Sequence, residues 1–346
     1  MADPAGRTVL MTGGSGYLGG WCIAALLERG YTVRTTIRDL AREGHVRSQV
    51  EAAGVDAGGR LTVLAADLMD DAGWAEAVAG CDCVLHTASP FPPAQPKDPD
   101  ELIVPARDGA LRVIGAALDA GVGRIVMTSS VAAIRGSQPA LGGGAYTERD
   151  WTDGDDAGLL PYTRSKAIAE REAWKLVAEA GAEERLAVVN PGAIIGPALS
   201  DDVSFSLQVV ERLLGGMPAL PRIGFCFVDV RDVADLHLRA MEGDAAAGRR
   251  FIAADRWMWM ADVARVLQDR LGERARKVTT RVAPDLLIRV LGRFDPSVRT
   301  VVPALGESYE VSSARARREL GWSPRPLEES IAETGESLIA HGVVKA

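Results

Sequence analysis

Tyr162 and Lys166 are four residues apart in the segment PYTRSK, at the start of a stretch, 161–180, that we expect to be a helix. This spacing places both side chains on one helical face. A cationic lysine beside a phenol favours the phenolate and lowers a tyrosine pKa that begins near ~10. Such a tyrosine can exchange a proton with a substrate oxygen, so the pair predicts acid–base chemistry. The alternative is an ordinary exposed helix pair.

Ser129 and Ser130 follow residues 124–128, an apolar segment that predicts a buried strand. A serine hydroxyl at that position can donate a hydrogen bond to a carbonyl oxygen. Neither serine lies in a G-x-S-x-G segment between a strand and a helix, which argues against a hydrolase nucleophile. Serine pairs are also common turn elements after strands, so this assignment depends on Tyr162 and Lys166.

A glycine-rich turn, TGGSGYLG at 12–19, joins the first predicted strand directly to a helix. Gly13 permits a tight turn, Gly16 lets the backbone approach a pyrophosphate, and Gly19 allows the helix to pack closely on the strand. The helix N-terminus supplies free N–H groups and a partial positive charge to the phosphates. A glycine turn can serve geometry alone, but its place in the first strand–helix unit favours a dinucleotide site.

The second predicted strand ends in Ile37, Arg38 and Asp39. Enzymes that use NAD usually have an acid here that holds both ribose hydroxyls, and Ile37 takes that position. The Arg38 guanidinium can bind a 2′-phosphate and stack on adenine, so we predict NADP(H), although Asp39 could still reach a ribose. Asp67 and Leu68, after the third strand, are placed to meet adenine. Asp67 could instead cap a helix.

Short apolar runs alternate with longer segments of helical period in the first half of the chain. The predicted strands are 8–11, 31–37, 61–66, 83–87 and 124–128. The helices between them include 20–29, 72–79 and 101–120. Nearly continuous apolar strands are buried on both faces, which predicts a parallel sheet covered by helices on each side.

A further strand, 186–189, is followed by a Gly/Pro break at 190–197, beyond which we expect the sheet to continue. The alternation of strands and helices is less regular after this break. Two further strands are expected at 226–228 and 250–254. Further helices are expected at 204–214, 230–241, 259–271, 313–320 and 327–341. We predict a doubly wound parallel (Rossmann) α/β sheet in an NADP-binding domain, 1–190. A smaller C-terminal α/β lobe, 191–346, would bind substrate, with some segments returning to the first domain.

Composition excludes several other classes. The net charge of −8 argues against nucleic acid or an anionic membrane as a partner. No stretch approaches the ~20 apolar residues of a membrane span, no signal peptide is recognisable, and we expect a cytoplasmic protein. The four histidines lack metal-ligand spacing, so no metal site is expected. The four cysteines, Cys22, Cys81, Cys83 and Cys226, predict core thiols in a reducing compartment.

These features together resemble the extended short-chain dehydrogenase/reductases. Within them the chain resembles the branch of dihydroflavonol 4-reductases, cinnamoyl-CoA reductases and aldehyde reductases. The motifs that carry the resemblance span nearly the whole chain in the family's order. They are TGGSGYLG at 12–19, TVRTTIRD at 32–39, VLHTASP at 84–90, VMTSS at 126–130, YTRSK at 162–166, VVNPGAIIGP at 188–197, FVDVRDVAD at 227–235 and SSARARRELGW at 312–322.

The resemblance implies a catalytic set of Ser130, Tyr162 and Lys166, in which the second serine of the pair acts and Lys166 also holds the nicotinamide ribose. It places Asn190, Pro191 and Gly192 beside the nicotinamide. The remaining cofactor contacts that it implies are Thr12, Ser15, Tyr17, Leu18, Thr87, Ala88 and Ser89. The implied activity is reduction of an aldehyde or ketone with NADPH.

The substrate side is less determined by sequence, and residues 275–305 match no motif. A pocket of Ser89, Pro90, Phe91, Pro92, Val131, Phe225 and Phe227 would favour a hydrophobic or aromatic carbonyl compound, unless the phenylalanines are core residues. One alternative is a nucleotide-sugar epimerase or dehydratase, which shares the fold and the Tyr/Lys pair. Many such epimerases carry Tyr-Gly after the serines, where this chain continues VAAIRG. Another alternative is a non-catalytic NADP-binding regulator. We expect a monomer or homodimer.

Overall fold

The computed structural model describes residues 4, 6–90, 96, 98–204 and 206–345. The chain forms two compact units. Unit 1 comprises Met1–Pro191, Arg231–Ala253 and Ser312–Ser323, and unit 2 comprises Gly192–Val230, Ala254–Val311 and Pro324–Ala346. From the sequence we expected a domain boundary after residue 190, with some later segments returning to the first domain. In the structure the first segment of unit 1 ends at Pro191, and two later segments belong to the same unit.

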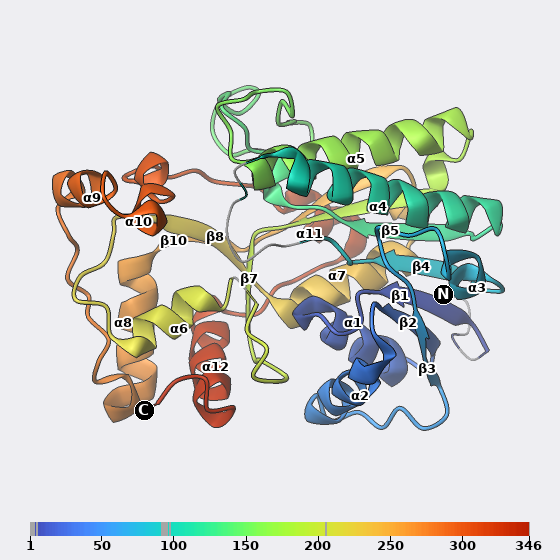
Figure 1. Ribbon diagram of the computed structural model, residues 1–346, viewed down its shortest axis with the longest axis horizontal. Helices are drawn as coiled ribbons and strands as arrows, with labels where there is room; N and C mark the ends of the chain where they lie inside the picture. Colours follow the sequence, from blue (N-terminus) through green and yellow to red (C-terminus); the bar gives the residue numbers. More distant parts are fainter. Residues whose placement is uncertain (1–3, 5, 91–95, 97, 205, 346) are drawn as a thin grey trace. The chain divides into compact units, whose positions relative to one another are not determined.

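Unit 1 is built on a seven-stranded parallel sheet of order β3-β2-β1-β4-β5-β6-β9 (Figure 1). The strands are β1 (Thr8–Thr12), β2 (Thr32–Ile37), β3 (Leu61–Ala65), β4 (Cys83–His86), β5 (Arg124–Thr128), β6 (Leu186–Pro191) and β9 (Arg249–Ala253). The strand order reverses between β1 and β4, and ligands of such sheets bind beyond the carboxyl ends of the strands at this reversal. The predicted doubly wound fold is confirmed.

Helices cover both faces of this sheet. Figure 1 shows α4 and α5 along one face and α1, α2 and α7 along the other. The helices of unit 1 are α1 (Tyr17–Glu28), α2 (Glu43–Ala52), α3 (Trp74–Val78), α4 (Asp100–Asp119), α5 (Pro161–Glu179), α7 (Val230–Glu242, from Arg231 on) and α11 (Ala314–Leu320). The length of α4 and α5 lets them bury an apolar stripe across several strands.

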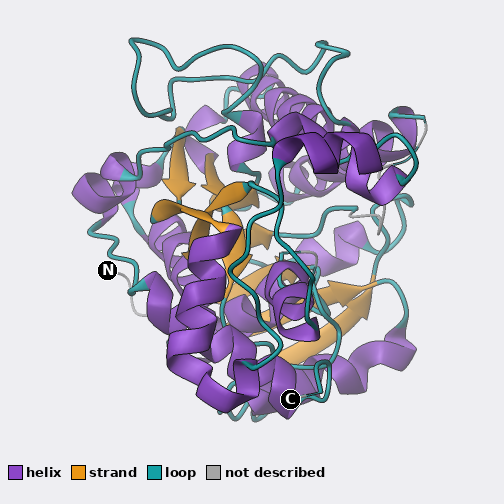
Figure 2. Cartoon of the chain, turned by 90° about the vertical axis from the view of Figure 1, so that its left-hand side faces the viewer, coloured by secondary structure: helices purple, strands orange, loops and turns teal. Residues whose placement is uncertain are grey.

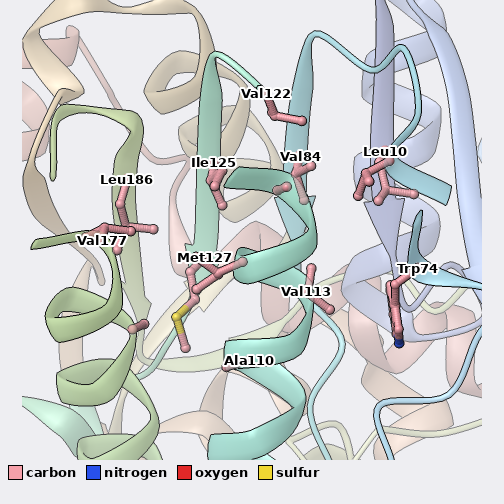
Figure 3. Packing of buried hydrophobic residues seen from close by; sticks show 14 of the residues in the cluster. Leu10, Trp74, Val84, Ala110, Val113, Val122, Ile125, Met127, Val177 and Leu186 are labelled. Carbon is pink, nitrogen blue, oxygen red and sulfur yellow. The ribbon is translucent and has the colours of Figure 1, made fainter. Parts of the chain in front are cut away.

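One layer of the core of unit 1 lies between the sheet and this pair of long helices. Leu10, Val84 and Ile125 come from three neighbouring strands and meet Val113 of α4 and Val177 of α5 (Figure 3). All five side chains are buried. Burial of such a side chain stabilises a fold by roughly 1.5–3 kcal/mol, so this layer fixes the positions of the strand ends that carry the site.

Unit 2 has its own three-stranded sheet of order β10-β8-β7. Its elements are β7 (Ala193–Ile195), α6 (Gln208–Gly215), β8 (Gly224–Asp229), β10 (Arg256–Trp259), α8 (Met260–Leu271), α9 (Asp285–Leu291), α10 (Pro296–Arg299) and α12 (Leu327–Ala340). The first sheet continues past residue 197 as expected, in β9, which pairs with β6, whereas β7 pairs with β8 in the sheet of unit 2. Gly192 permits this course, since a Cβ there would lie 2.1 Å from the Cys226 carbonyl oxygen.

Figure 2 shows the chain coloured by helix, strand and loop. Several predicted element bounds differ from those of the structure. Helix α1 begins at Tyr17, three residues before the predicted start. Residues 256–259 form β10, where a helix was expected from residue 259. Helix α2 was missed because its sequence is largely polar and buries only Val46, Gln49 and Val50. The four cysteines are buried free thiols, as predicted. None of the helices in the described ranges is both long and apolar enough to cross a membrane.

Candidate active site

The glycine-rich turn holds α1 tightly against the end of β1. Gly13 has a φ of +76°, a region that favours glycine. A Cβ at Gly19 would lie 2.2 Å from the Gly13 carbonyl oxygen, and one at Gly14 would lie 2.1 Å from Thr35 Oγ1. A larger residue at Gly19 would clash with the backbone of the turn, and one at Gly14 would clash with the Thr35 side chain. The helix therefore starts directly on the turn, as the sequence predicted.

The N-terminus of α1 is available to an anion. Gly16 is its N-cap residue, and no side chain caps the helix. A Cβ at Gly16 would meet only the Gly13 carbonyl oxygen, at 3.3 Å, so the backbone has open space above it. Ser15, Tyr17 and Leu18 are partly exposed around it. Free N–H groups, the helix dipole and an open glycine fit the pyrophosphate of a dinucleotide.

The end of β2 presents Arg38 to solvent. Ile37 is buried and Arg38 is exposed. Asp39 Oδ1 accepts a 2.9 Å hydrogen bond from the Ala41 N–H and thereby caps a 3₁₀ turn, Leu40–Arg42. The two candidate cofactor contacts thus differ. The Asp39 carboxylate is hydrogen-bonded to the backbone, whereas the Arg38 guanidinium forms no ion pair within the described part of the chain.

Asp67 and Leu68 follow β3 and are both partly exposed. Asp67 Oδ1 accepts a 2.9 Å hydrogen bond from the Met69 N–H, so one of its carboxylate oxygens orders the turn. Leu68 packs on α4, where a Cβ at Gly109 would lie 2.9 Å from that of Leu68. Their predicted contact with adenine stays a prediction.

A buried hydrogen bond joins β1 to β4 at the reversal of strand order. Thr12 Oγ1 lies 2.8 Å from His86 Nδ1, and both side chains are buried. Thr12 Oγ1 also accepts from the Ala88 N–H at 3.2 Å, and Thr87 Oγ1 donates to the Thr12 carbonyl at 2.9 Å. Burial, helped by the charge of Lys166, lowers the pKa of His86 to about 3. The Thr12 hydroxyl is thus hydrogen-bonded to His86 and to the Ala88 N–H. The neutral His86 side chain, which no sequence motif singled out, is part of this site.

Ser130 begins the turn after β5. It is the N-cap of the 3₁₀ turn Val131–Ala133, and its Oγ accepts a 3.1 Å hydrogen bond from the Ala132 N–H. The same hydroxyl is hydrogen-bonded to the phenol of Tyr162. The predicted serine and tyrosine therefore meet. The hydroxyl of Ser129 is buried and has no hydrogen-bond partner in the described residues.

Lys166 lies one turn after Tyr162 on α5, and its Nζ is 5.9 Å from the centroid of the Tyr162 ring. Nζ donates a 2.9 Å hydrogen bond to Ser89 Oγ. Burial lowers the pKa of Lys166 to about 8, while the negative charge of Glu170 opposes that shift. The lysine thus joins α5 to the loop after β4.

The expected lowering of the Tyr162 pKa by Lys166 is wrong for this structure. Burial raises the pKa of the Tyr162 phenol, and the group that lowers it in part is Ser130. The sequence showed the two side chains on one helix face but could not show how deeply the phenol is buried. A phenol with a raised pKa keeps its proton at neutral pH, which suits a proton donor.

The predicted substrate residues are divided between the two units. Ser89 and Val131 belong to unit 1, whereas Phe225 and Phe227 belong to unit 2, as does Gly192 of the predicted nicotinamide segment. Phe227 is 1% exposed and packs edge-on against the partly buried Phe225, with ring centroids 5.7 Å apart. Phe91 and Pro92 lie outside the described residues. The assignment of the phenylalanines to substrate stays a prediction.

Comparison with known proteins agrees with this geometry. A model of the NAD dependent epimerase/dehydratase family matches residues 9–254. Cinnamoyl-CoA reductase CAD2 of Medicago truncatula is 35% identical over 338 residues, covering 96% of both chains. Dihydroflavonol 4-reductase of Zea mays is 32% identical over 277 residues, covering 77% of this chain and 75% of that protein. The structure of yeast methylglyoxal/isovaleraldehyde reductase Gre2 complexed with NADPH has a TM-score of 0.80 at 23% identity, covering 98% of this chain and 100% of that one.

Proposed function

Because the chain belongs to the NAD dependent epimerase/dehydratase family, as an extended short-chain dehydrogenase/reductase, we propose that it reduces an aldehyde or ketone with NADPH. The observation that carries the proposal is the hydrogen bond between the hydroxyls of Ser130 and Tyr162, with Lys166 one helical turn away. These groups follow β5 and begin α5 in the unit that carries the glycine-rich turn. The similarity to reductases supports the assignment of this chain as an oxidoreductase.

The residues divide the cofactor and the reaction between them. Gly13, Gly16 and the N-terminus of α1 would hold the pyrophosphate, and Arg38 would bind the 2′-phosphate. NADPH, when bound, supplies a hydride to the carbonyl carbon. Tyr162 then donates its phenolic proton to the carbonyl oxygen, a contribution worth about 10²–10⁴ in rate. Ser130 donates a hydrogen bond to the same oxygen as negative charge develops there.

Lys166 serves the same step in two ways. As an ammonium group it stabilises the phenolate that remains on Tyr162 after proton transfer. It would also hold the nicotinamide ribose, and its 2.9 Å hydrogen bond to Ser89 directs the ammonium group. Apolar residues near the serine turn, among them buried Val131, favour a hydrophobic or aromatic carbonyl compound.

A nucleotide-sugar epimerase or dehydratase is the second candidate, because the matching family model includes such enzymes. The exposed Arg38 after Ile37 favours NADPH over the tightly held NAD of many epimerases. A panel assay separates the two functions. We expect oxidation of NADPH at 340 nm with aromatic aldehydes, ketones or flavanonols and none with UDP-sugars. Conversion of a UDP-sugar with no net change in the cofactor would support the epimerase, and activity with neither class would overturn the reductase proposal.

A further inference from the structure

An ion pair is buried close to the proposed catalytic residues. Glu170 and Arg250 have side chains that are 0% and 6% exposed. Arg250 Nε lies 2.5 Å from Glu170 Oε1, and Arg250 Nη2 lies 3.3 Å from Oε2. Glu170 is on α5, one turn after Lys166, and Arg250 is on β9. Neither residue belongs to a motif with a predicted role.

Glu170 is connected to the catalytic serine through Asn190. Asn190 Nδ2 donates to Glu170 Oε2 at 2.8 Å and to the Ser130 carbonyl oxygen at 3.2 Å. Two acceptors thus face the amide nitrogen, which fixes the orientation of the side chain. Asn190 Oδ1 is buried and finds no partner among the residues that the structure describes. Glu170 on α5 therefore positions Asn190, which in turn holds the backbone carbonyl of Ser130.

Arg250 holds the other end of the same turn. Its Nη2 donates to the Ala133 carbonyl oxygen at 3.4 Å, and its Nη1 donates to the carbonyl oxygens of Glu148 and Asp150 at 3.2 and 2.9 Å. Its guanidinium lies 3.6 Å from the centroid of the Trp151 ring. The turn that starts at Ser130 is thus fixed at its first residue through Asn190 and at Ala133 through Arg250.

The geometry points to Glu170 and Arg250 as positioning residues that hold the Ser130 turn in register with Tyr162 and Lys166 on α5. This inference rests on the proposed function of those three residues. A buried ion pair is weak evidence for stability, because apolar replacements of similar volume are often as stable. Hydrogen bonds that reach two carbonyl oxygens of one turn, that of Ser130 from Asn190 and that of Ala133 from Arg250, are better explained by the need to keep that turn in place.

The electrostatic surroundings of Lys166 support the assignment. The groups that face Lys166 are Tyr162 and Glu170 on its own helix, and His86 and Ser89 from β4 and the loop after it. Only Glu170 carries a negative charge among these. It opposes the effect of burial on the pKa of Lys166, so loss of its charge should favour the neutral amine.

Kinetics of two variants test the positioning role. In Glu170→Gln the amide keeps one acceptor oxygen for the two donors Asn190 Nδ2 and Arg250 Nε, so one of these hydrogen bonds is lost and the charge is removed. In Arg250→Met the fork to Ala133 is lost. We expect kcat at pH 7 to fall at least tenfold in both, with KM within about threefold of wild type. Glu319→Gln removes the exposed ion pair of Arg249, the neighbour of Arg250, and should keep kcat within twofold. Variants that only lose Tm while kcat stays within twofold would overturn the inference.

NMR titration of the lysine side chains gives a readout that does not need turnover. The chain has five lysines, and Lys166→Met assigns the signal. Lys166 should titrate near pH 8 in wild type, at lower pH in Glu170→Gln and at higher pH in Arg250→Met, where Glu170 is no longer neutralised. An unchanged titration in both variants would overturn the inference even if the wild type reduced no carbonyl compound, an outcome that by itself would reject only the proposed function.

Arg250→Lys keeps the inference testable if either variant fails to fold. A lysine retains the positive charge and one contact to Glu170 but cannot reach Ala133 and Asp150 together. The Lys166 titration should then stay near that of wild type while kcat remains at least fivefold below it. Full recovery of kcat would show that charge alone suffices and would overturn the positioning role.

Discussion

The ammonium group of Lys166 donates a 2.9 Å hydrogen bond to the hydroxyl of Ser89, so the helix that carries Tyr162 is joined to the loop after β4. Burial lowers the pKa of this lysine to about 8, and a neutral acceptor such as Ser89 Oγ favours its charged form. The charge state of Lys166 therefore changes within a pH range that is easily measured.

We expect the rate of carbonyl reduction to fall as the pH rises through about 8, because the ammonium form is needed to stabilise the Tyr162 phenolate. Ser89→Ala removes the acceptor and should move this decline to lower pH. Profiles of kcat between pH 6 and 10 measure both. A decline at the same pH in wild type and Ser89→Ala would contradict the role of the hydrogen bond.

Unfolding can be separated from this decline. The unfolded lysine titrates near ~10.4, above its folded value of about 8, so the unfolded state binds more protons between these values. From this group alone, the free energy of unfolding rises with pH across that window. The titration of Lys166 should therefore lower kcat with rising pH without lowering Tm. Tm measured in the same buffers checks this.

Tyr162→Phe removes the proton donor and keeps the ring. We expect this variant to fold, to bind NADPH with a Kd within about threefold of wild type, and to lose about 10²–10⁴ in kcat. Lys166→Met should lose both rate and NADPH affinity, because one residue serves both tasks. Turnover by Tyr162→Phe within a few-fold of wild type would require withdrawal of Ser130, Tyr162 and Lys166 together.

What the sequence could predict was local. The turn at Gly13 and Gly19 and the spacing of Tyr162 and Lys166 follow from the geometry of a few neighbouring residues. Glu170 and Arg250 are 80 positions apart, and no local pattern announces their contact. The direction of the Tyr162 pKa depends on burial by segments distant in sequence, so the helix spacing alone gave the wrong sign. Likewise no local pattern shows that β7 pairs with β8, where Gly192 comes close to Cys226.

Arg38 should determine the preference for NADPH. It is exposed after β2, where the usual acidic residue is replaced by buried Ile37. Arg38→Asp should weaken NADPH binding by roughly one to two decades, the cost of a charge-assisted contact of about 1.5–3 kcal/mol, and should improve NADH relative to NADPH. Fluorescence titration with both cofactors measures this. Arg47→Gln, which breaks an exposed pair with Glu43, is the matched control and should change neither Kd.

Phe225 and Phe227 separate a binding role from a packing role. Phe227 is 1% exposed, so Phe227→Ala should destabilise the fold by about 3–5 kcal/mol, which thermal or urea unfolding measures.

Phe225 is only partly buried beside Phe227. If Phe225 contacts substrate, Phe225→Ala should raise KM for a bulky aromatic carbonyl compound several-fold while kcat and the Kd of NADPH stay near wild type, because only uniform apolar binding is lost. A small aliphatic aldehyde is the control substrate, since it is too short to gain from the phenyl ring, and its KM should not move. Equal KM values for the bulky substrate in wild type and Phe225→Ala, together with a loss of Tm, would make Phe225 a packing residue and move the substrate pocket elsewhere.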